Sequence, residues 1–383
     1  MNFDLLETHL LLEESTRRFA SECLAKDAAQ RDKNHEIPDE TIAALASVGL
    51  LGVNLPESLG GSAMGVVSYA IAVREVARAD ASVAVTMAVT NMVGEVLRTF
   101  GTLEQQEEHI PRLTSGEYFA GAFALSEPGA GSDAGSLRTR AVRDGNDWIL
   151  NGEKMWITSG DRAGVMVVWA RTGESGTKGL SCFVVPGGTP GVEAGLPEEK
   201  MGLRASHTVS LSFGNVRLPS SALLGEEGDG FKIAMTALDG GRIGISAQAV
   251  GIGTAALEEA RRYAGERKQF GRSIGDFQGI AFKLADMSTN LDASWLLTLR
   301  AAWLKEQGRR FTREAAMAKV MASETANDVV RDAVQIFGGY GYTEEFPVAR
   351  YYRDARVTQI YEGTSEIQRV VIGREVLKGA GVS

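Results

Sequence analysis

The stretch Gln359-Ile-Tyr-Glu-Gly-Thr-Ser-Glu-Ile-Gln-Arg369 is the most informative part of this 383-residue sequence. Ser365, followed three residues later by Gln368, matches a capping box, so a helix is predicted to start at about Glu366. Glu362 then lies in a loop just ahead of the helix. A carboxylate held in such a loop can be partly desolvated, which raises its pKa and makes it a better base. An ordinary exposed Glu in a turn explains this loop equally well.

The chain divides into three blocks. Residues 1–118 are predicted to be helical, with an Ala/Val-rich segment at 64–99 that has the composition of a buried helix pair. Residues 119–228 change from the helical period to the two-residue period of strands, and short strands separated by turns predict a small β-barrel or sandwich. Residues 229–383 are helical again. The order predicts a mainly α protein with a central β-barrel, and ligands favour the crevices between such domains.

Two patterns give local detail. The segment Asp147-Trp-Ile-Leu-Asn-Gly152 predicts a strand that runs into an Asn-Gly hairpin turn. In the last block, apolar residues at steps of three and four predict a long amphipathic helix. Short loops at Gly271 and Gly308 then imply an up-down four-helix bundle. The residues of the apolar series are Phe277, Ile280, Leu284, Met287, Leu291 and Trp295.

The composition excludes several classes of protein. Hydrophobic residues make up 44% and charged residues 23% of the chain, which are globular values. The net charge of −9 does not suit a protein that coats nucleic acid. A few local Arg and Lys residues nevertheless suffice to hold a small polyanionic ligand.

Cysteine, histidine and terminal patterns narrow the classes further. Cys23 and Cys182 lie far apart in sequence, which excludes a disulfide framework and a cysteine-based zinc site. The four histidines are scattered, so no metal ligands are assigned. The apolar runs are too short to span a bilayer. The N-terminus shows no signal or presequence pattern, so a cytoplasmic protein is expected; a mature organellar protein would look the same.

The loop Phe123-Ala-Leu-Ser-Glu-Pro-Gly-Ala-Gly-Ser-Asp133 lies at the edge of the strand-rich block. Its small residues let backbone N–H groups approach a flat ring or a phosphate. A wide turn stabilised by Pro128 explains it as well. Further along, Trp156 and Thr158 are two residues apart on a strand and point to the same face. They could cover a flat cofactor ring, or they could be a core aromatic residue beside a strand threonine.

Gly240 and Gly241 interrupt an otherwise good helix, where each costs about 1 kcal/mol relative to Ala. That cost suggests the close approach of another backbone or a ligand. The alternative for the flanking residues Asp239 and Arg242 is a surface ion pair one helical turn apart.

Two more segments lie at predicted helix ends. Glu266-Arg-Lys-Gln-Phe-Gly271 either complements the helix dipole or contacts a phosphate through Arg267. Gln335-Ile-Phe-Gly-Gly-Tyr-Gly-Tyr342 has three glycines in four residues, although a helix stop needs only one. The excess indicates that a diphosphate or another chain passes close by. The alternative is that these glycines only end the helix.

Together these segments resemble the acyl-CoA dehydrogenase family, in order and over essentially the whole chain. The strongest matches are Leu125-Ser-Glu-Pro-Gly-Ala-Gly-Ser-Asp133, Lys154-Met-Trp-Ile-Thr158, Gln335-Ile-Phe-Gly-Gly339 and Arg353-Asp-Ala-Arg-Val-Thr-Gln-Ile-Tyr-Glu-Gly-Thr-Ser-Glu-Ile-Gln368. The resemblance implies an N-terminal helical domain at 1–118, a β-barrel at 119–228 and a four-helix bundle at 229–383. It also implies FAD between barrel and bundle.

The resemblance assigns roles residue by residue. The flavin ring would contact Phe123, Leu125, Ser126, Trp156 and Thr158, and the adenosine diphosphate part would contact Thr364 and Glu366. A neighbouring subunit's FAD would contact Arg267, Phe270, Gln278, Gln335, Gly338 and Gly339, which makes a homotetramer, a dimer of dimers, the expected assembly. The acyl-CoA would contact Ser132, Asp239, Arg242, Tyr361 and Gly363.

The implied chemistry is α,β-dehydrogenation of an acyl-CoA thioester. Glu362 would remove the α-proton, the β-hydrogen would leave as hydride to the flavin, and the product would be a trans-2-enoyl-CoA. The Glu362 backbone N–H and a flavin ribityl hydroxyl would stabilise the enolate-like oxygen. Electrons would pass to electron-transfer flavoprotein.

One point of variation supports Glu362 as the base. Some family members place the base on the helix that here contains Gly240 and Gly241, and these positions hold no carboxylate. Asp239, the only acid there, matches a binding position. Ser126 and the stretch Ala-Met-Ala-Lys-Val-Met-Ala322 most resemble the short-chain, butyryl-CoA-like members.

Other functions stay open at this level. An acyl-CoA oxidase would use the same site with oxygen, and the acyl group could be branched, cyclic, glutaryl-like or bound to a carrier protein. A non-catalytic flavin-binding relative that binds DNA would be favoured by a basic extension, which the sequence lacks. A purely structural helical protein is disfavoured by the glycine-rich loops. Acyl chain length would depend on residues around 87–93.

Overall fold

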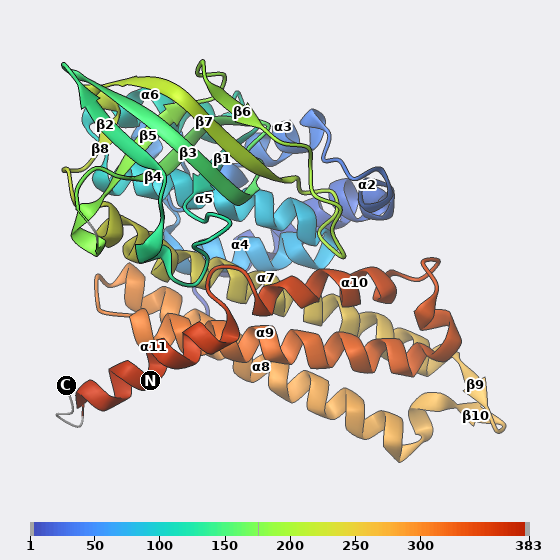
Figure 1. Ribbon diagram of the computed structural model, residues 1–383. Coiled ribbons are helices and arrows are strands. Elements are labelled where there is room, and N and C mark those ends of the chain that lie inside the picture. Colours follow the sequence, from blue (N-terminus) through green and yellow to red (C-terminus); the bar gives the residue numbers. More distant parts are fainter. Residues whose placement is uncertain (1–3, 175, 380–383) are drawn as a thin grey trace.

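The computed structural model describes residues 4–174 and 176–379. A strand-rich layer and the N-terminal helices form one half of the molecule, and long helices form the other (Figure 1). The N-terminal helices are α1 (Glu7–Phe19), α2 (Ala28–Asn34), α3 (Asp39–Ser47), α4 (Gly65–Ala79), α5 (Ala81–Phe100) and α6 (Leu103–Thr114). Within the described residues, no helix is both long and apolar enough to cross a membrane.

Helices α4 and α5 confirm the predicted buried pair. Asp80 separates them and caps α5, because its Oδ1 accepts hydrogen bonds from the N–H groups of Ser82 at 2.9 Å and Val83 at 3.2 Å. Its Oδ2 accepts from Arg31 Nε at 2.8 Å. Asp80 therefore ends one helix, starts the next and ties both to α2.

The middle of the chain forms one mixed sheet. Its strands are β1 (Ala120–Ala124), β2 (Arg140–Asp144), β3 (Asp147–Thr158), β4 (Ala163–Arg171), β5 (Leu180–Pro186), β6 (Val192–Ala194), β7 (Thr208–Pro219) and β8 (Leu223–Leu224). The pairing order is β6-β7-β3-β2-β4-β5-β8, and β1 pairs with β4 in parallel.

The expected closure into a barrel is not confirmed, because the described pairings do not join β6 to β8. The sheet encloses an apolar core of its own that includes Trp148, Phe183 and Phe213. Its other face packs on α5 and on the start of the first bundle helix, where Trp169 Nε1 donates to Gly230 O at 2.7 Å. The sheet's own strands thus supply the apolar core on one face, and helices cover the other.

The predicted hairpin turn at Asn151 and Gly152 is wrong. Strand β3 continues to Thr158, and the turn between β2 and β3 falls at Gly145, whose φ is 64°. Gly152 has a φ of 146° and marks a shift in register against β7. The Asn-Gly pair therefore forms a bulge, a feature that shares the turn's need for a permissive residue.

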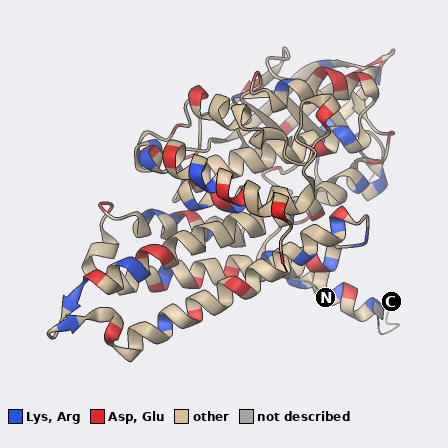
Figure 2. Cartoon of the chain, turned by 180° about the vertical axis from the view of Figure 1, so that it is seen from behind, with Lys and Arg blue, Asp and Glu red and all other residues tan. Residues whose placement is uncertain are grey.

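The C-terminal half confirms the predicted bundle. Helices α7 (Gly230–Glu266), α8 (Gln278–Glu306), α9 (Thr312–Phe337) and α10 (Pro347–Arg356) pack together, and α11 (Ser365–Gly379) extends from them (Figure 1). Gly271 and Gly308 both have positive φ at the predicted turns. The first turn contains a short hairpin of β9 (Lys268–Gln269) and β10 (Arg272–Ser273), whose basic residues are blue in Figure 2.

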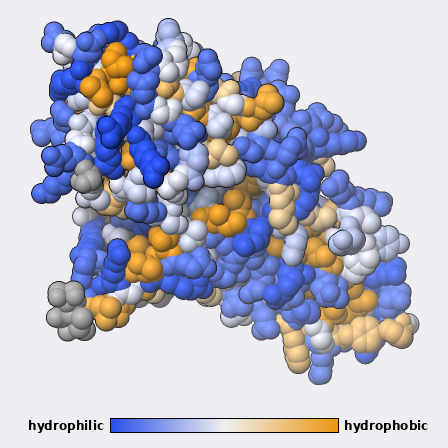
Figure 3. Space-filling view, viewed as in Figure 1, coloured by the Kyte–Doolittle hydropathy of each residue, from blue (hydrophilic) through white to orange (hydrophobic). Residues whose placement is uncertain are grey.

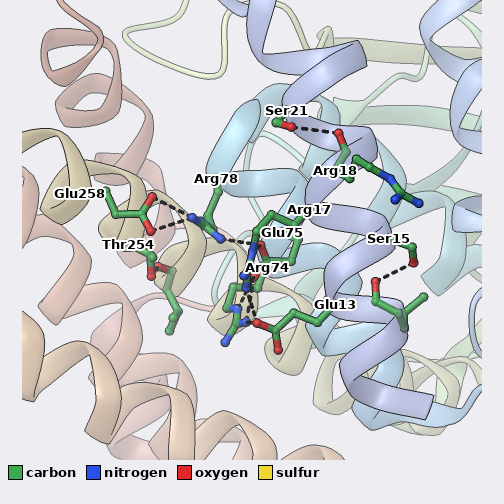
Figure 4. A network of polar contacts seen from close by, with 12 residues as sticks. Glu13, Ser15, Arg17, Arg18, Ser21, Arg74, Glu75, Arg78, Thr254 and Glu258 are labelled. Carbon is green, nitrogen blue, oxygen red and sulfur yellow. Dashed lines mark hydrogen bonds and ion pairs between the residues drawn. The ribbon is translucent and has the colours of Figure 1, made fainter. Parts of the chain in front are cut away.

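A buried carboxylate joins the two helical halves (Figure 4). Glu75, on α4, is 1% exposed and accepts hydrogen bonds from Arg17 at 2.9 Å, Arg74 at 2.9 Å and Arg78 at 2.6 Å. Arg78 also binds Glu258 on α7. Burial raises the pKa of Glu75, but the Arg17 hydrogen bond and the arginine charges outweigh this effect and leave the pKa lowered.

The Glu75 contacts predict a large loss of stability on truncation. Glu75→Ala leaves three arginines without their common partner and should cost about 3 kcal/mol of unfolding free energy. Because the pKa of Glu75 is lowered, the difference from wild type should shrink as pH falls through that pKa. Glu258→Ala, which removes a partly exposed partner, should cost less than about 1 kcal/mol. Urea unfolding followed by circular dichroism checks both, and equal losses would contradict the expected role of Glu75.

Candidate active site

The Glu362 loop has an unusual backbone. Glu362 and Gly363 have φ values of 53° and 87°, so two consecutive residues are left-handed. Glu362 lies ahead of α11, as predicted. The predicted capping box of Ser365 and Gln368 is wrong, because Thr364 Oγ1 accepts from the Ile367 N–H at 3.3 Å.

Gln368 and Lys319 hold this loop. Gln368 Nε2 donates to the carbonyl oxygens of Glu362 at 3.2 Å and Gly363 at 2.9 Å. Lys319, on α9, donates from Nζ to the same Gly363 oxygen at 2.8 Å. These donors compensate for a strained conformation that the loop would not adopt by itself.

The Glu362 carboxyl group faces Gly241 on α7. Glu362 Oε2 is shielded from solvent and has no hydrogen-bond partner. A Cβ atom added at Gly241 would lie 2.8 Å from this oxygen and 3.0 Å from Met92 Sδ. Burial raises the pKa of Glu362 to about 7, with the charges of Arg242 and Lys319 acting to lower it. The group can therefore accept a proton near neutral pH.

Asp239 and Arg242 form a largely buried pair near Glu362, not a surface pair. Arg242 is 5% exposed and donates to Asp239, which also accepts from Thr312 Oγ1 at 2.6 Å. Arg242 Nε is buried without a partner. Tyr361 turns inward instead and donates its hydroxyl to Gln248. The predicted substrate residues on α7 and in the loop thus adjoin Glu362, whereas Ser132 is exposed on the strand-rich side.

The loop after β1 is fixed by a second buried lysine. Lys154, fully buried on β3, donates to Leu125 O at 3.1 Å and Glu127 Oε1 at 2.8 Å. The Met155 N–H donates to Ser126 O at 2.9 Å. Leu125 and Ser126 therefore lie against the end of β3, as their predicted common role requires.

Trp156 and Thr158 lie on the less buried side of this strand end. Trp156 has a φ of 65° at a break in the register with β7 and is 59% exposed. Phe123, on β1, packs its ring 4.3 Å from that of Trp169 and also contacts the bundle core. Hydrophobic residues gather where the sheet half meets the helical half (Figure 3).

The remaining predicted cofactor residues form a separate group. Arg267 lies 5.8 Å from the Tyr340 ring, and Phe270, which is 92% exposed, lies 6.1 Å from Phe277. This end of the bundle carries the exposed residues Arg267, Phe270, Gln278, Gln335, Gly338 and Gly339. In one chain, they are remote from the start of α11, where Thr364 and Glu366 lie (Figure 1).

Comparisons with known proteins agree with this arrangement. Models of the acyl-CoA dehydrogenase N-terminal, middle and C-terminal domains match residues 6–117, 122–216 and 228–377. The short-chain specific acyl-CoA dehydrogenase of Bos taurus mitochondria is 49% identical over 378 residues, which cover 98% of this chain and 91% of that protein.

Solved structures share the fold over nearly the whole chain. Butyryl-CoA dehydrogenase from Megasphaera elsdenii is 44% identical with a TM-score of 0.96, covering 98% of this chain and 100% of that one. A chain from a structure of the electron transferring flavoprotein of Acidaminococcus fermentans is 43% identical with a TM-score of 0.97, at the same coverage. With three matching domains and such relatives, the protein belongs to the acyl-CoA dehydrogenase family of oxidoreductases.

Proposed function

We propose that this enzyme uses FAD to convert a short-chain acyl-CoA thioester to its trans-2-enoyl-CoA, with Glu362 as the base. The observation that carries the proposal is the Glu362 carboxyl group, whose Oε2 is shielded from solvent without a hydrogen-bond partner and whose pKa is raised to about 7 by burial. Such an acid in a structural role would normally be paired. Its placement against Gly241 leaves it ready for a substrate proton.

The loop after β1 and the end of β3 have features that fit FAD. The Trp156 indole is 59% exposed beside the 125–127 loop and offers a flat surface for a ring. Gly129 and Gly131 have open space where a Cβ would lie, so the backbone there can be approached closely. Phe123, Leu125, Ser126, Trp156 and Thr158 would hold the flavin ring, and Thr364 and Glu366 its diphosphate side. When bound, FAD would serve as the hydride acceptor.

The protein's own part in the reaction is positioning and proton transfer. Glu362 Oε2 would take the α-proton, and the Glu362 main-chain N–H would stabilise the thioester oxygen as negative charge develops there. Asp239 and Arg242, fixed to each other and to Thr312, would align the coenzyme A arm. Ser132 would complete the substrate contacts at the edge of the cofactor.

The proposed length of the acyl chain and the proposed electron acceptor rest on the similar proteins. The short-chain and butyryl-CoA dehydrogenases that resemble this chain support a short acyl group. The similar chain in an electron transferring flavoprotein structure supports such a flavoprotein as electron acceptor. An oxidase would instead be reoxidised rapidly by oxygen.

A second subunit is expected to complete each FAD site. Gly241 and Arg267 lie 26 residues apart along α7, so at 1.5 Å per residue about 39 Å separates them. One bound FAD cannot contact both ends of this helix in the same chain. The group around Phe270 is therefore proposed to serve a neighbouring chain, in a homotetramer.

Glu362→Gln is expected to retain FAD and bind acyl-CoA, but to slow flavin reduction by about a thousandfold. In the wild type, the rate should rise with pH through about 7, because the carboxylate form is the base and burial holds its pKa there. Anaerobic stopped-flow bleaching with a panel of acyl-CoAs measures both. Near wild-type bleaching would move the base elsewhere, with Asp239 the next candidate.

Gly241→Ala is expected to lower the reduction rate by about a hundredfold, because the added Cβ lies 2.8 Å from Glu362 Oε2 and must displace it. Gly265→Ala is the matched control on the same helix, with open space at its Cβ. It should leave the rate unchanged and add about 0.5–1 kcal/mol of stability. Equal rates in the two variants would show that Gly241 does not face the reacting groups.

Phe270→Ala is expected to lose FAD while changing monomer stability by less than about 0.5 kcal/mol, because the ring is 92% exposed. Leu196→Ala, at a site 89% exposed, should retain FAD. Hybrids that mix Phe270→Ala and Glu362→Gln subunits should regain activity. In such a hybrid, one shared site combines the intact Glu362 of the first subunit with the intact Phe270 of the second. Inactive hybrids after verified subunit exchange would argue against shared sites.

A further inference from the structure

Two lysines are among the largest fully buried side chains of the described residues, and they differ in their charge compensation. Lys154 is paired with its own acid, Glu127, at 2.8 Å. Lys319 forms no ion pair with a carboxylate within the described part of the chain, and its hydrogen bond goes to the Gly363 carbonyl. A buried ammonium without an adjacent acid is costly and calls for an explanation.

The hydrogen bond of Lys319 is placed to control the base loop. Its acceptor, Gly363 O, belongs to the residue that follows Glu362. Glu362 and Gly363 are the two left-handed residues of the loop, and Gln368 Nε2 donates to both of their carbonyls. Rotation of the Gly363 peptide would break the Lys319 contact, so the ammonium restrains the turn from which the Glu362 side chain projects.

Among the charges around Lys319, Glu362 has the largest effect on its pKa, followed by the opposing effect of Arg242. Burial lowers the pKa of Lys319 to about 8, and Glu362 acts to raise it, ahead of Glu324 and Glu366. Lys319 is therefore mainly charged at neutral pH. Arg242, on α7, is the other cation that acts on Glu362.

Tyr69 on α4 and Tyr361 in the loop are the phenols whose ionisation the Glu362 charge opposes. Burial raises the pKa of both phenols above the ordinary value, so they stay neutral when Glu362 titrates. The balance of charge at the base is thus set by Arg242 and Lys319.

We propose that Lys319 is a positioning residue for the base, which fixes the Glu362–Gly363 turn through the Gly363 carbonyl and keeps the Glu362 carboxylate ionised in its buried surroundings. The role as base rests on the function proposed above, whereas the coupling between the two charges does not. A purely structural lysine would fill the same space without influencing the protonation of Glu362.

The pH dependence of flavin reduction separates these roles. Lys319→Met removes the charge at similar volume, so the midpoint of the rate profile should move up by about one pH unit. The rate should then rise again at alkaline pH, where Glu362 is ionised, but to a plateau below wild type, because the hydrogen bond to the Gly363 carbonyl is also lost. Lys319→Arg should return the midpoint to the wild-type value. An unchanged midpoint in the Met variant overturns the proposal.

Lys232→Met is the control for loss of a lysine, because Lys232 is exposed on α7. It should leave the midpoint in place. FAD content and circular dichroism of each variant establish that the comparison is between folded holoenzymes.

A second measurement needs no turnover. Between about pH 7 and pH 8, where both groups carry charge, Lys319→Met should lower the thermal midpoint more in the wild type than in a Glu362→Gln background. Equal drops in the two backgrounds show no coupling and overturn the proposal. If no acyl-CoA bleaches the wild type, the proposed function fails, yet this cycle still decides whether Lys319 and Glu362 are coupled.

Discussion

Keeping one carboxyl group out of water, yet able to ionise, is the constraint on which the site depends. Glu362 meets it through its loop, because left-handed residues at 362 and 363 turn the side chain toward α7 rather than outward. The loop in turn requires Gln368 and Lys319 as donors to its carbonyls. Strain in the backbone is therefore compensated by hydrogen bonds from two helices, an arrangement typical of residues held for chemistry.

The close approach of neighbouring elements accounts for several glycines of α7. Gly241 faces Glu362 and Met92, Gly244 faces the Tyr69 hydroxyl, and Gly251 faces the Arg74 carbonyl. Each glycine weakens the helix by itself. Together they let α4, α5 and the base loop approach the α7 axis closely, and the packing of Ile243, Ala247 and Val250 offsets the cost. The Glu75 contacts with three arginines then hold α4 in place against α1 and α7.

Periodicity and residue chemistry predicted more of this structure than local turn signals did. The helix pair at 64–99, the bundle and the place of Glu362 ahead of a helix could all be predicted, because apolar spacing and polar residues at a helix start report on local backbone. The cap itself is Thr364 and not the predicted Ser365. The prediction of an Asn-Gly turn was wrong because a bulge in β3 needs the same residues. The predicted closure of the sheet into a barrel is not confirmed, because closure depends on pairing between distant edge strands. The contact of Lys319 with Gly363 spans 44 residues of sequence. Its only local signal is the buried neighbours Ala315, Ala316, Ala322 and Ser323 on one face of α9.

The two buried lysines show how one type of contact can serve two purposes. Each ammonium donates to a main-chain carbonyl of a loop in the site, Leu125 for Lys154 and Gly363 for Lys319. An amide side chain could donate either hydrogen bond, so the hydrogen bonds alone do not explain why both residues are charged lysines. At Lys154 the charge is matched by Glu127, whose other hydrogen bonds come from the N–H groups of Arg138 and Thr139, and this pair stabilises a fixed loop. At Lys319 the leading opposite charge is Glu362, so in the proposed role holding the loop and setting the ionisation of Glu362 become one interaction.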